Sequence, residues 1–236
     1  MSPADSDKAH RHFDEKLAEV RELLLQMATK AEGQVRAALE VVKQRDGQGA
    51  NLTIERDHQI DALEMDIEER AINLLARQQP MAIDLRMLVA SLKISNDLER
   101  VGDHAVNIAQ CAKRLAEAYP VEAIGELDLM AEDATGMLQD AIGAFVEEDP
   151  NRARDVLTRD DRVDRYNDVV FRVMLERMAE NTNTIVAGLQ MMLVARNLER
   201  VADLATNLAE DVIYIVEART IKHHAADHET EGSFDQ

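Results

Sequence analysis

The chain is poor in the residues that form covalent cross-links, tight turns and aromatic cores. Its 236 residues include one cysteine, no tryptophan, four prolines and nine glycines, and aromatic residues make up 3%. The single cysteine, Cys111, excludes an internal disulfide and suits a reducing compartment. The abundance of Ala, Leu, Val, Glu, Arg and Met instead favours an all-helical fold.

Long apolar runs and excess positive charge are also missing. The opening residues, MSPADSDKAHRHF, lack the apolar core of a signal peptide, and the longest apolar stretch, Ile185–Ala195, is too short to span a membrane. The formal net charge of −19 argues against nucleic acid and against direct docking on anionic lipid. We therefore expect no nucleic-acid partner and no membrane insertion, and the acidity favours cations or basic protein surfaces as partners.

One segment of the chain occurs twice. Residues 98–109 read LERVGDHAVNIA and residues 198–209 read LERVADLATNLA, with eight of twelve positions identical at an offset of 100. Each copy carries two acidic residues and an asparagine spaced four apart: Glu99, Asp103 and Asn107 in the first, and Glu199, Asp203 and Asn207 in the second. Residues four apart share one face of a helix, so each copy presents an oxygen-rich stripe. Packing alone requires only apolar periodicity, and the repeated polar residues therefore suggest a binding role.

Apolar residues at steps of three and four predict the helical framework. Six helices are expected, over about 8–45, 52–77, 81–118, 121–147, 150–180 and 183–222. Asp149-Pro150 is a helix-start signal, with aspartate as the cap and proline at the first position. We predict an all-α fold of six long helices arranged as two tandem, pseudo-symmetric three-helix bundles, residues 1–120 and 121–222. A polar tail, residues 223–236, is expected to be disordered.

A second acidic stripe precedes each copy of the repeat. The stripes contain Asp57, Asp61 and Glu64 before the first copy, and Asp160, Asp164, Asn167 and Asp168 before the second. Antiparallel packing would bring each stripe beside its copy, where the carboxylates repel one another unless a cation or protons neutralise them. Ligation by oxygen alone indicates Mg, Ca, Mn or oxidised iron, with zinc also possible.

The pattern predicts two metal sites with related ligand sets. Their candidate ligands are Asp57, Asp61, Glu99 and Asp103 in one site and Asp160, Asp164, Glu199 and Asp203 in the other, with Asn107, Asn207, Glu64 and Asp168 as additional candidates. Arg100 and Arg200 are interpreted as partners that hold the carboxylates in place. His104 is a weak ligand candidate because Leu204 occupies the equivalent position in the second copy.

Two other interpretations stay open. Acidic pairs four apart also occur outside the repeat, for example Glu15 with Glu19, so the chain could be a metal-free helical scaffold with solvated acidic faces. A ferritin-like di-metal carboxylate enzyme would need two Glu-x-x-His motifs, and only Glu55 with His58 has that form.

The strings NDLERVGDHAVNIA and RNLERVADLATNLAEDVIYIVEA resemble the paired signature of the PhoU family, regulators of phosphate transport and phosphate signalling. Pro80, the segment Asp84-Leu85-Arg86 and the closing residues 220–224 extend the likeness from the first helix to about His224. The resemblance places the family's Glu/Asp-x-x-x-Asp motifs on the eight main candidate ligands. It implies two three-helix bundles, with iron or zinc clusters at those motifs in some members.

The same resemblance implies a way of acting. It predicts a cytoplasmic, often homodimeric protein that is not an enzyme and regulates by docking. The implied partners are the ATPase subunit of the phosphate ABC transporter and a membrane sensor histidine kinase. Through them such proteins repress phosphate-starvation genes when phosphate is plentiful.

Overall fold

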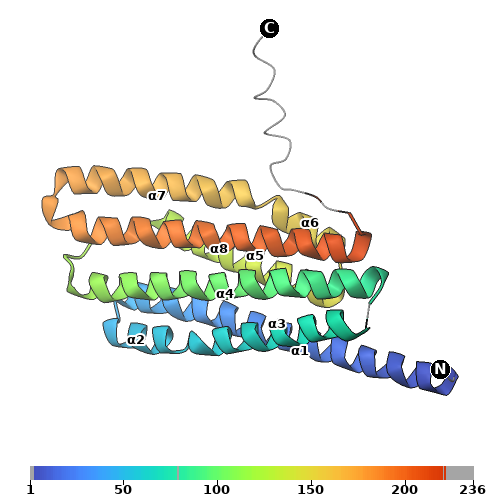
Figure 1. Ribbon diagram of the computed structural model, residues 1–236. Coiled ribbons are helices and arrows are strands. Elements are labelled where there is room, and N and C mark those ends of the chain that lie inside the picture. The colour runs from blue at the N-terminus through green and yellow to red at the C-terminus, as the bar shows by residue number, and fades with distance from the viewer. Residues whose placement is uncertain (1–2, 79, 220, 222–236) are drawn as a thin grey trace, which may run out of the picture.

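The chain folds into an elongated stack of long helices (Figure 1). The computed structural model describes residues 3–78, 80–219 and 221, and that part of the chain contains no strand. Its elements are α1 (Pro3–Gln44), α2 (Gly47–Glu55), α3 (His58–Gln78), α4 (Ala82–Glu117), α5 (Gly125–Glu147), α6 (Pro150–Leu157), α7 (Asp160–Glu180), the short 3₁₀ helix η1 (Thr182–Thr184) and α8 (Ile185–Glu217). The predicted disordered tail, residues 223–236, lies outside the described residues.

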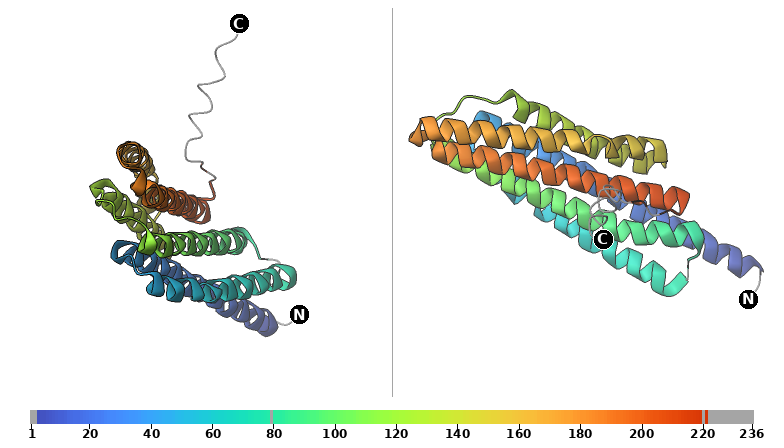
Figure 2. Two further views of the ribbon diagram at one scale, coloured as in Figure 1. Left: turned by 90° about the vertical axis from the view of Figure 1, so that its left-hand side faces the viewer. Right: turned by 90° about the horizontal axis from the view of Figure 1, so that it is seen from above.

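The two halves repeat one order of helices, which confirms the predicted fold class. A long helix is followed by a short and a longer one and then by another long helix, in α1–α4 and again in α5–α8. Helices α4 and α8 pack against each other, with α1 and α3 against α4 and with α5 and α7 against α8 (Figures 1 and 2). None of the described helices is long and apolar enough to cross a membrane.

Two of the six predicted helices are each broken in two. The helix expected over 52–77 starts at Gly47 and is interrupted at Arg56 and Asp57, and the helix expected over 150–180 is interrupted at Thr158 and Arg159. Both breaks are tight turns closed by hydrogen bonds between residues three apart, such as Asp57 N to Ile54 O (3.2 Å) and Arg159 N to Val156 O (3.0 Å). Apolar periodicity misses these breaks because the inward stripe resumes after each turn.

Aspartate caps set the start of the short helix in each half. Asp149 Oδ1 accepts hydrogen bonds from the backbone N–H groups of Asn151 (2.8 Å) and Arg152 (3.3 Å), as the Asp149-Pro150 signal predicts. Asp46 caps α2 in the same way, through the N–H groups of Gln48 and Gly49. This cap explains why the second predicted helix begins earlier than its apolar pattern indicated.

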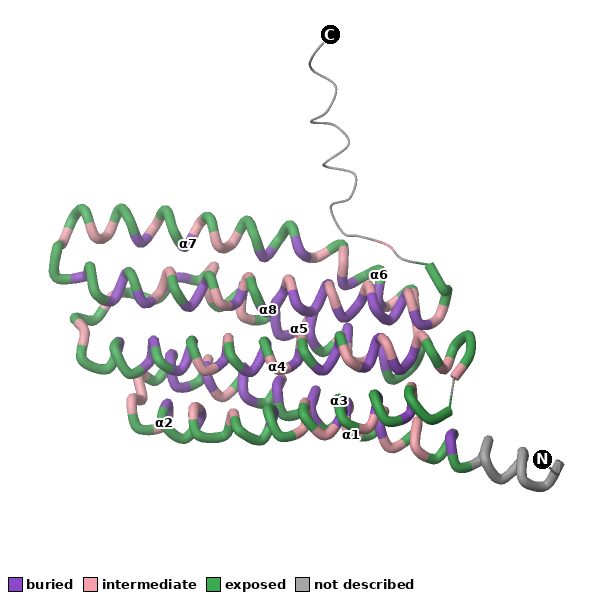
Figure 3. Tube along the Cα trace, viewed as in Figure 1, coloured by how far each residue is buried: buried purple, intermediate pink, exposed green. Residues whose placement is uncertain are grey.

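The contact between α4 and α8 joins the two halves. Figure 3 shows buried residues along the inward sides of both helices, and the repeated Leu98 and Leu198 are among them. Polar contacts also cross this interface: Lys93 Nζ to Asp211 Oδ1 (3.1 Å), His104 Nδ1 to Asn197 Oδ1 (2.9 Å) and Arg86 Nε to Ile215 O (3.1 Å). Since residue numbers rise on α4 as they fall on α8 along these pairs, the two helices run antiparallel.

The single cysteine is a buried residue of α4. Cys111 is 4% exposed, and burial raises the pKa of its thiol to about 11, partly offset by the charge of Arg114. Because the thiolate is the reactive form, we expect a disulfide thiol reagent to modify the folded protein at least about a hundredfold more slowly than the urea-unfolded chain. Absorbance of the released thiol measures both rates, and equal rates would contradict the burial of Cys111.

Candidate functional site

The acidic residues of the first half gather where α3 begins beside the middle of α4. Asp57 lies in the break between α2 and α3, and Asp61 lies one turn further on. Glu99 and Asp103 lie on α4, and Gly102 lets that helix approach the break closely. A Cβ atom at Gly102 would stand 2.9 Å from Asp57 Oδ1, which is tighter than side-chain packing tolerates.

Five carboxylates in this region act on one another electrostatically. We call them the first acidic cluster: Asp57, Asp61, Glu64, Glu99 and Asp103. The pKa of Glu99 is raised to about 7, first by burial and then by the charges of the other four members. Burial also raises the pKa of Asp57, with further contributions from Asp61 and Asp103. The cluster therefore favours uptake of positive charge.

Gln34 supports this cluster and was missed by the sequence analysis. Gln34 lies on α1 and is only 6% exposed. Its Nε2 donates a hydrogen bond to Asp57 Oδ1 (2.9 Å). The hydrogen bond stabilises the charged form of Asp57 and opposes the effect of burial on its pKa. A polar residue at an inward position of α1, between Ala31 and Ala38, was the available signal.

The acidic residues of the second half, Asp160, Asp164, Glu199 and Asp203, form what we call the second acidic cluster. Asp160 starts α7, as Asp57 precedes α3, and it is buried. Here positively charged and amide groups contact the carboxylates directly. Arg196 Nη1 lies 3.1 and 3.2 Å from the two carboxylate oxygens of Glu199, and Asn167 Nδ2 donates to Glu199 Oε2 (2.6 Å). Arg200 Nη1 pairs with Asp203 Oδ2 (2.8 Å).

The two arginines of the repeat have different partners. Arg200 holds a carboxylate of its own cluster, as the sequence analysis expected, whereas Arg100 Nη1 pairs with Asp97 Oδ1 at 3.3 Å. His104, considered a weak ligand candidate, contacts Asn197 across the α4–α8 interface. It therefore has a packing role in this structure.

The additional candidate ligands are dispersed. Glu64 joins the first acidic cluster and accepts a long hydrogen bond from Asn96 Nδ2 (3.5 Å). Asn107 and Asp168 are exposed on α4 and α7. Asn207 lines a groove of about 440 Å³ between α4 and α8, together with Asp97.

The residue types and charge of the first acidic cluster fit a cation that prefers oxygen ligands. In the part of the chain that the structure describes, no three His, Cys, Asp or Glu side chains stand in an arrangement that could hold a metal ion. Metal binding would therefore require the carboxylates to turn toward a common point. Asp61 and Asp103 are exposed, which leaves their side chains room to do so. In the second acidic cluster, bound arginines already neutralise Glu199 and Asp203.

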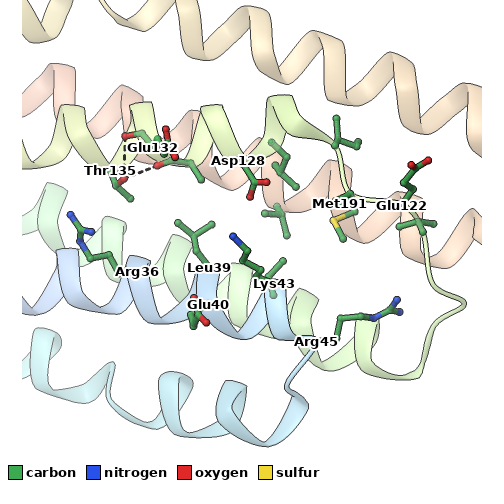
Figure 4. A pocket seen from close by; sticks show the side chains of 17 residues that line it. Arg36, Leu39, Glu40, Lys43, Arg45, Glu122, Asp128, Glu132, Thr135 and Met191 are labelled. Atoms are coloured by element: carbon green, nitrogen blue, oxygen red, sulfur yellow. Dashed lines mark hydrogen bonds between the residues drawn. The ribbon is translucent and has the colours of Figure 1, made fainter.

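A cavity of about 570 Å³ lies away from both acidic clusters, between α1, α5 and the connection at residues 121–124 (Figure 4). Arg36 and Lys43 line it from α1, and Asp128 and Glu132 line it from α5. Side chains of both charge signs are thus mixed along its wall. A wall of mixed charge does not indicate a particular class of ligand, so the acidic clusters are the candidate functional site.

Comparisons with known proteins place this geometry in a family. The PhoU domain matches residues 24–112 and 127–212. The phosphate-specific transport system accessory protein PhoU homolog of Caulobacter vibrioides is 39% identical over 201 residues, covering 85% of this chain and 87% of that protein. The homolog of the same name from Clostridium acetobutylicum is 35% identical, over 89% of this chain and 96% of that protein.

Solved structures agree with the sequence relatives. The crystal structure of PhoU from Pseudomonas aeruginosa superimposes with a TM-score of 0.84 at 35% identity, covering 88% of this chain and 100% of that chain. The phosphate transport system regulatory protein PhoU from Streptococcus pneumoniae gives a TM-score of 0.83 at 27% identity, over 89% and 99%. The matches span both halves and both copies of the repeat, and the chain belongs to the PhoU family.

Proposed function

We propose that this protein is a cytoplasmic regulator of phosphate transport and phosphate-starvation signalling that acts by docking, without catalytic turnover. The observation that carries the proposal is the likeness to phosphate-transport accessory proteins along nearly the whole chain. That likeness includes the PhoU domain in both halves, where the acidic clusters lie. Its partners are the ATPase subunit of a phosphate ABC transporter and a sensor histidine kinase, and the active form is a homodimer.

An exposed apolar surface supports the docking part of the proposal. Large apolar side chains that are 40–53% exposed occupy the second half of α7 and the start of α8; this apolar α7/α8 face consists of Phe171, Leu175, Ile185, Val186, Leu189 and Leu193. Val186, Leu189 and Leu193 share one side of α8 by their helical spacing. Several large apolar side chains exposed on two neighbouring helices are typical of protein-interaction sites. The net charge of −19 favours a partner with basic residues around its contact region.

Replacing Leu189 by aspartate is expected to weaken capture of the transporter ATPase subunit about tenfold, because the charge would be desolvated in the complex. Folding should be unaffected, since Leu189 is 47% exposed. Leu129→Asp is the matched control, because Leu129 on α5 is also 47% exposed but lies outside the apolar α7/α8 face. Binding by purified components in a pull-down gives the readout. Equal capture of both variants and the wild type would refute a role for this face.

We further propose that the first acidic cluster binds a metal cation. The residues that would hold it are Asp57, Asp61, Glu99 and Asp103, with Glu64 beside them. By resemblance the ion is iron or zinc, and the oxygen donors also suit Mg, Mn or Ca. The bound cation would supply positive charge that cancels the repulsion among these carboxylates. Since the ligands come from both α3 and α4, binding would tie the two helices together, and Gln34 would keep Asp57 oriented.

Deletion of the gene tests the regulatory function. Phosphate-starvation genes are expected to stay on in phosphate-rich medium, or phosphate uptake to become deregulated, because the docking protein that couples transporter and kinase is gone. Reporter expression and labelled-phosphate uptake measure the two effects, and a plasmid copy of the wild-type gene should restore both. Unchanged expression and uptake, in a strain shown to lack a second PhoU protein, would contradict the proposal.

A further inference from the structure

The two acidic clusters differ at the residues around their glutamates. At the offset of 100 between α4 and α8, Asn96 of the first half corresponds to Arg196 of the second. At the offset of 103 that relates Asp57 to Asp160, Glu64 corresponds to Asn167. The first half therefore surrounds its glutamate with an amide and a carboxylate, whereas the second uses a guanidinium and an amide.

The contacts follow this difference in composition. Both carboxylate oxygens of Glu199 are engaged, by Arg196 and Asn167. Its counterpart Glu99 makes no hydrogen bond or ion pair within residues 3–78, 80–219 and 221, and its electrostatic neighbours are other carboxylates. The second cluster thus has arginines paired with its glutamate and with one of its aspartates, whereas in the first cluster Asp57 is compensated by the amide of Gln34 and the charge of His58.

The residue pair Asp97 and Asn197 extends the asymmetry by one more position. In the first half, Arg100 pairs with Asp97 at 3.3 Å. In the second half the position equivalent to Asp97 is Asn197, an uncharged residue, and Arg200 pairs with Asp203 at 2.8 Å. The repeated arginine therefore pairs with the residue three positions before it where that residue is an aspartate, and with the aspartate three positions after it where the earlier residue is an asparagine.

We propose that the two acidic clusters are not equivalent cation sites: the first takes up a cation from solution, whereas Arg196 and Arg200 serve as built-in counter-charges of the second. The proposal rests on the metal binding put forward under the proposed function and assigns the tight site to one half. A cation entering the second cluster has to displace two ion pairs and encounters two guanidinium groups. The Arg196 side chain is 54% exposed and can swing into solvent, so the second cluster retains weaker binding.

The test titrates the full-length, metal-stripped protein with Fe²⁺, Zn²⁺ and Mn²⁺ separately, by calorimetry, with the Fe²⁺ titration kept anaerobic. Binding is assigned to a half with Asp103→Asn, which disables the first cluster, and Asp203→Asn, which disables the second. We expect the first cluster to bind at least about tenfold more tightly than the second, since guanidinium charges a few ångströms away oppose cation entry. Circular dichroism verifies that each variant is folded.

Exchanging the distinguishing residue supplies the matched controls. Arg196→Asn gives the second half the residue of the first and should tighten its binding about tenfold, while Asn96→Arg should weaken the first cluster by a similar factor. Equal affinities of the two halves, or no effect of either exchange, would overturn the inference while leaving metal binding intact. No binding of any of the three ions would instead overturn the proposed metal function and the inference with it.

Discussion

Replacing Leu198 by alanine is expected to lower the free energy of unfolding by about 2–5 kcal/mol, the largest stability effect predicted for a single side chain here. Leu198 is 0% exposed and lies on α8, where that helix packs against α4. The substitution removes buried apolar surface and leaves a cavity at the contact that joins the two halves. Urea unfolding followed by far-UV circular dichroism measures the change.

Leu193→Ala is the control for this substitution. Leu193 lies on the same helix and loses the same atoms on mutation, but its side chain is 43% exposed. Its effect on the free energy of unfolding should stay within about 0.5 kcal/mol. Equally mild effects at the two positions would mean that α4 and α8 do not form the central packing contact. A large effect at Leu193 alone would indicate that the apolar α7/α8 face is covered in the free protein.

Much of the fold followed from sequence periodicity. The repeat at 98–109 and 198–209 combines identical apolar positions with a constant offset, and this pattern predicts two halves with the same order of helices. The caps at Asp46 and Asp149 act within three residues, so the Asp149-Pro150 start was predictable from the local sequence. The breaks at Arg56-Asp57 and Thr158-Arg159 were missed because they leave the apolar stripe unchanged. The Arg-Asp pair recurs as Arg56-Asp57 within the first break and as Arg159-Asp160 where the second break gives way to α7, and this recurrence was the signal that could have revealed them.

The candidate site was only partly accessible from the sequence. Spacings of four residues identified the carboxylates of each helix, because such spacings depend only on helix geometry. The partners of those carboxylates depend on how helices pack. Gln34 reaches Asp57 from α1, and Asn167 reaches Glu199 from α7. Whether a carboxylate is neutralised is thus decided by tertiary contacts, and the two similar halves acquire different charge balances.

Replacing Asp103 by asparagine is expected to have opposite effects with and without metal. In the metal-free protein the substitution removes one of the charges that repel Glu99, so stability should rise, by a few tenths to about 1 kcal/mol. In the presence of metal at 100 times the dissociation constant, the wild type should gain about 2.7 kcal/mol that the variant lacks. Thermal unfolding with and without the cation, read by circular dichroism, separates the two effects.

Asp203→Asn provides the contrast in the second half. Asp203 is paired with Arg200 in the metal-free state, so its neutralisation removes an attraction and should leave stability unchanged or slightly lower. Its metal-dependent stabilisation should remain close to that of the wild type, because the first acidic cluster is intact. A rise in metal-free stability for Asp103→Asn, matched by no rise for Asp203→Asn, would identify the first cluster as carboxylates held together for a ligand at some cost in stability. If Asp103→Asn destabilises the metal-free protein, the residue has a structural partner and the cluster is not arranged around a missing charge.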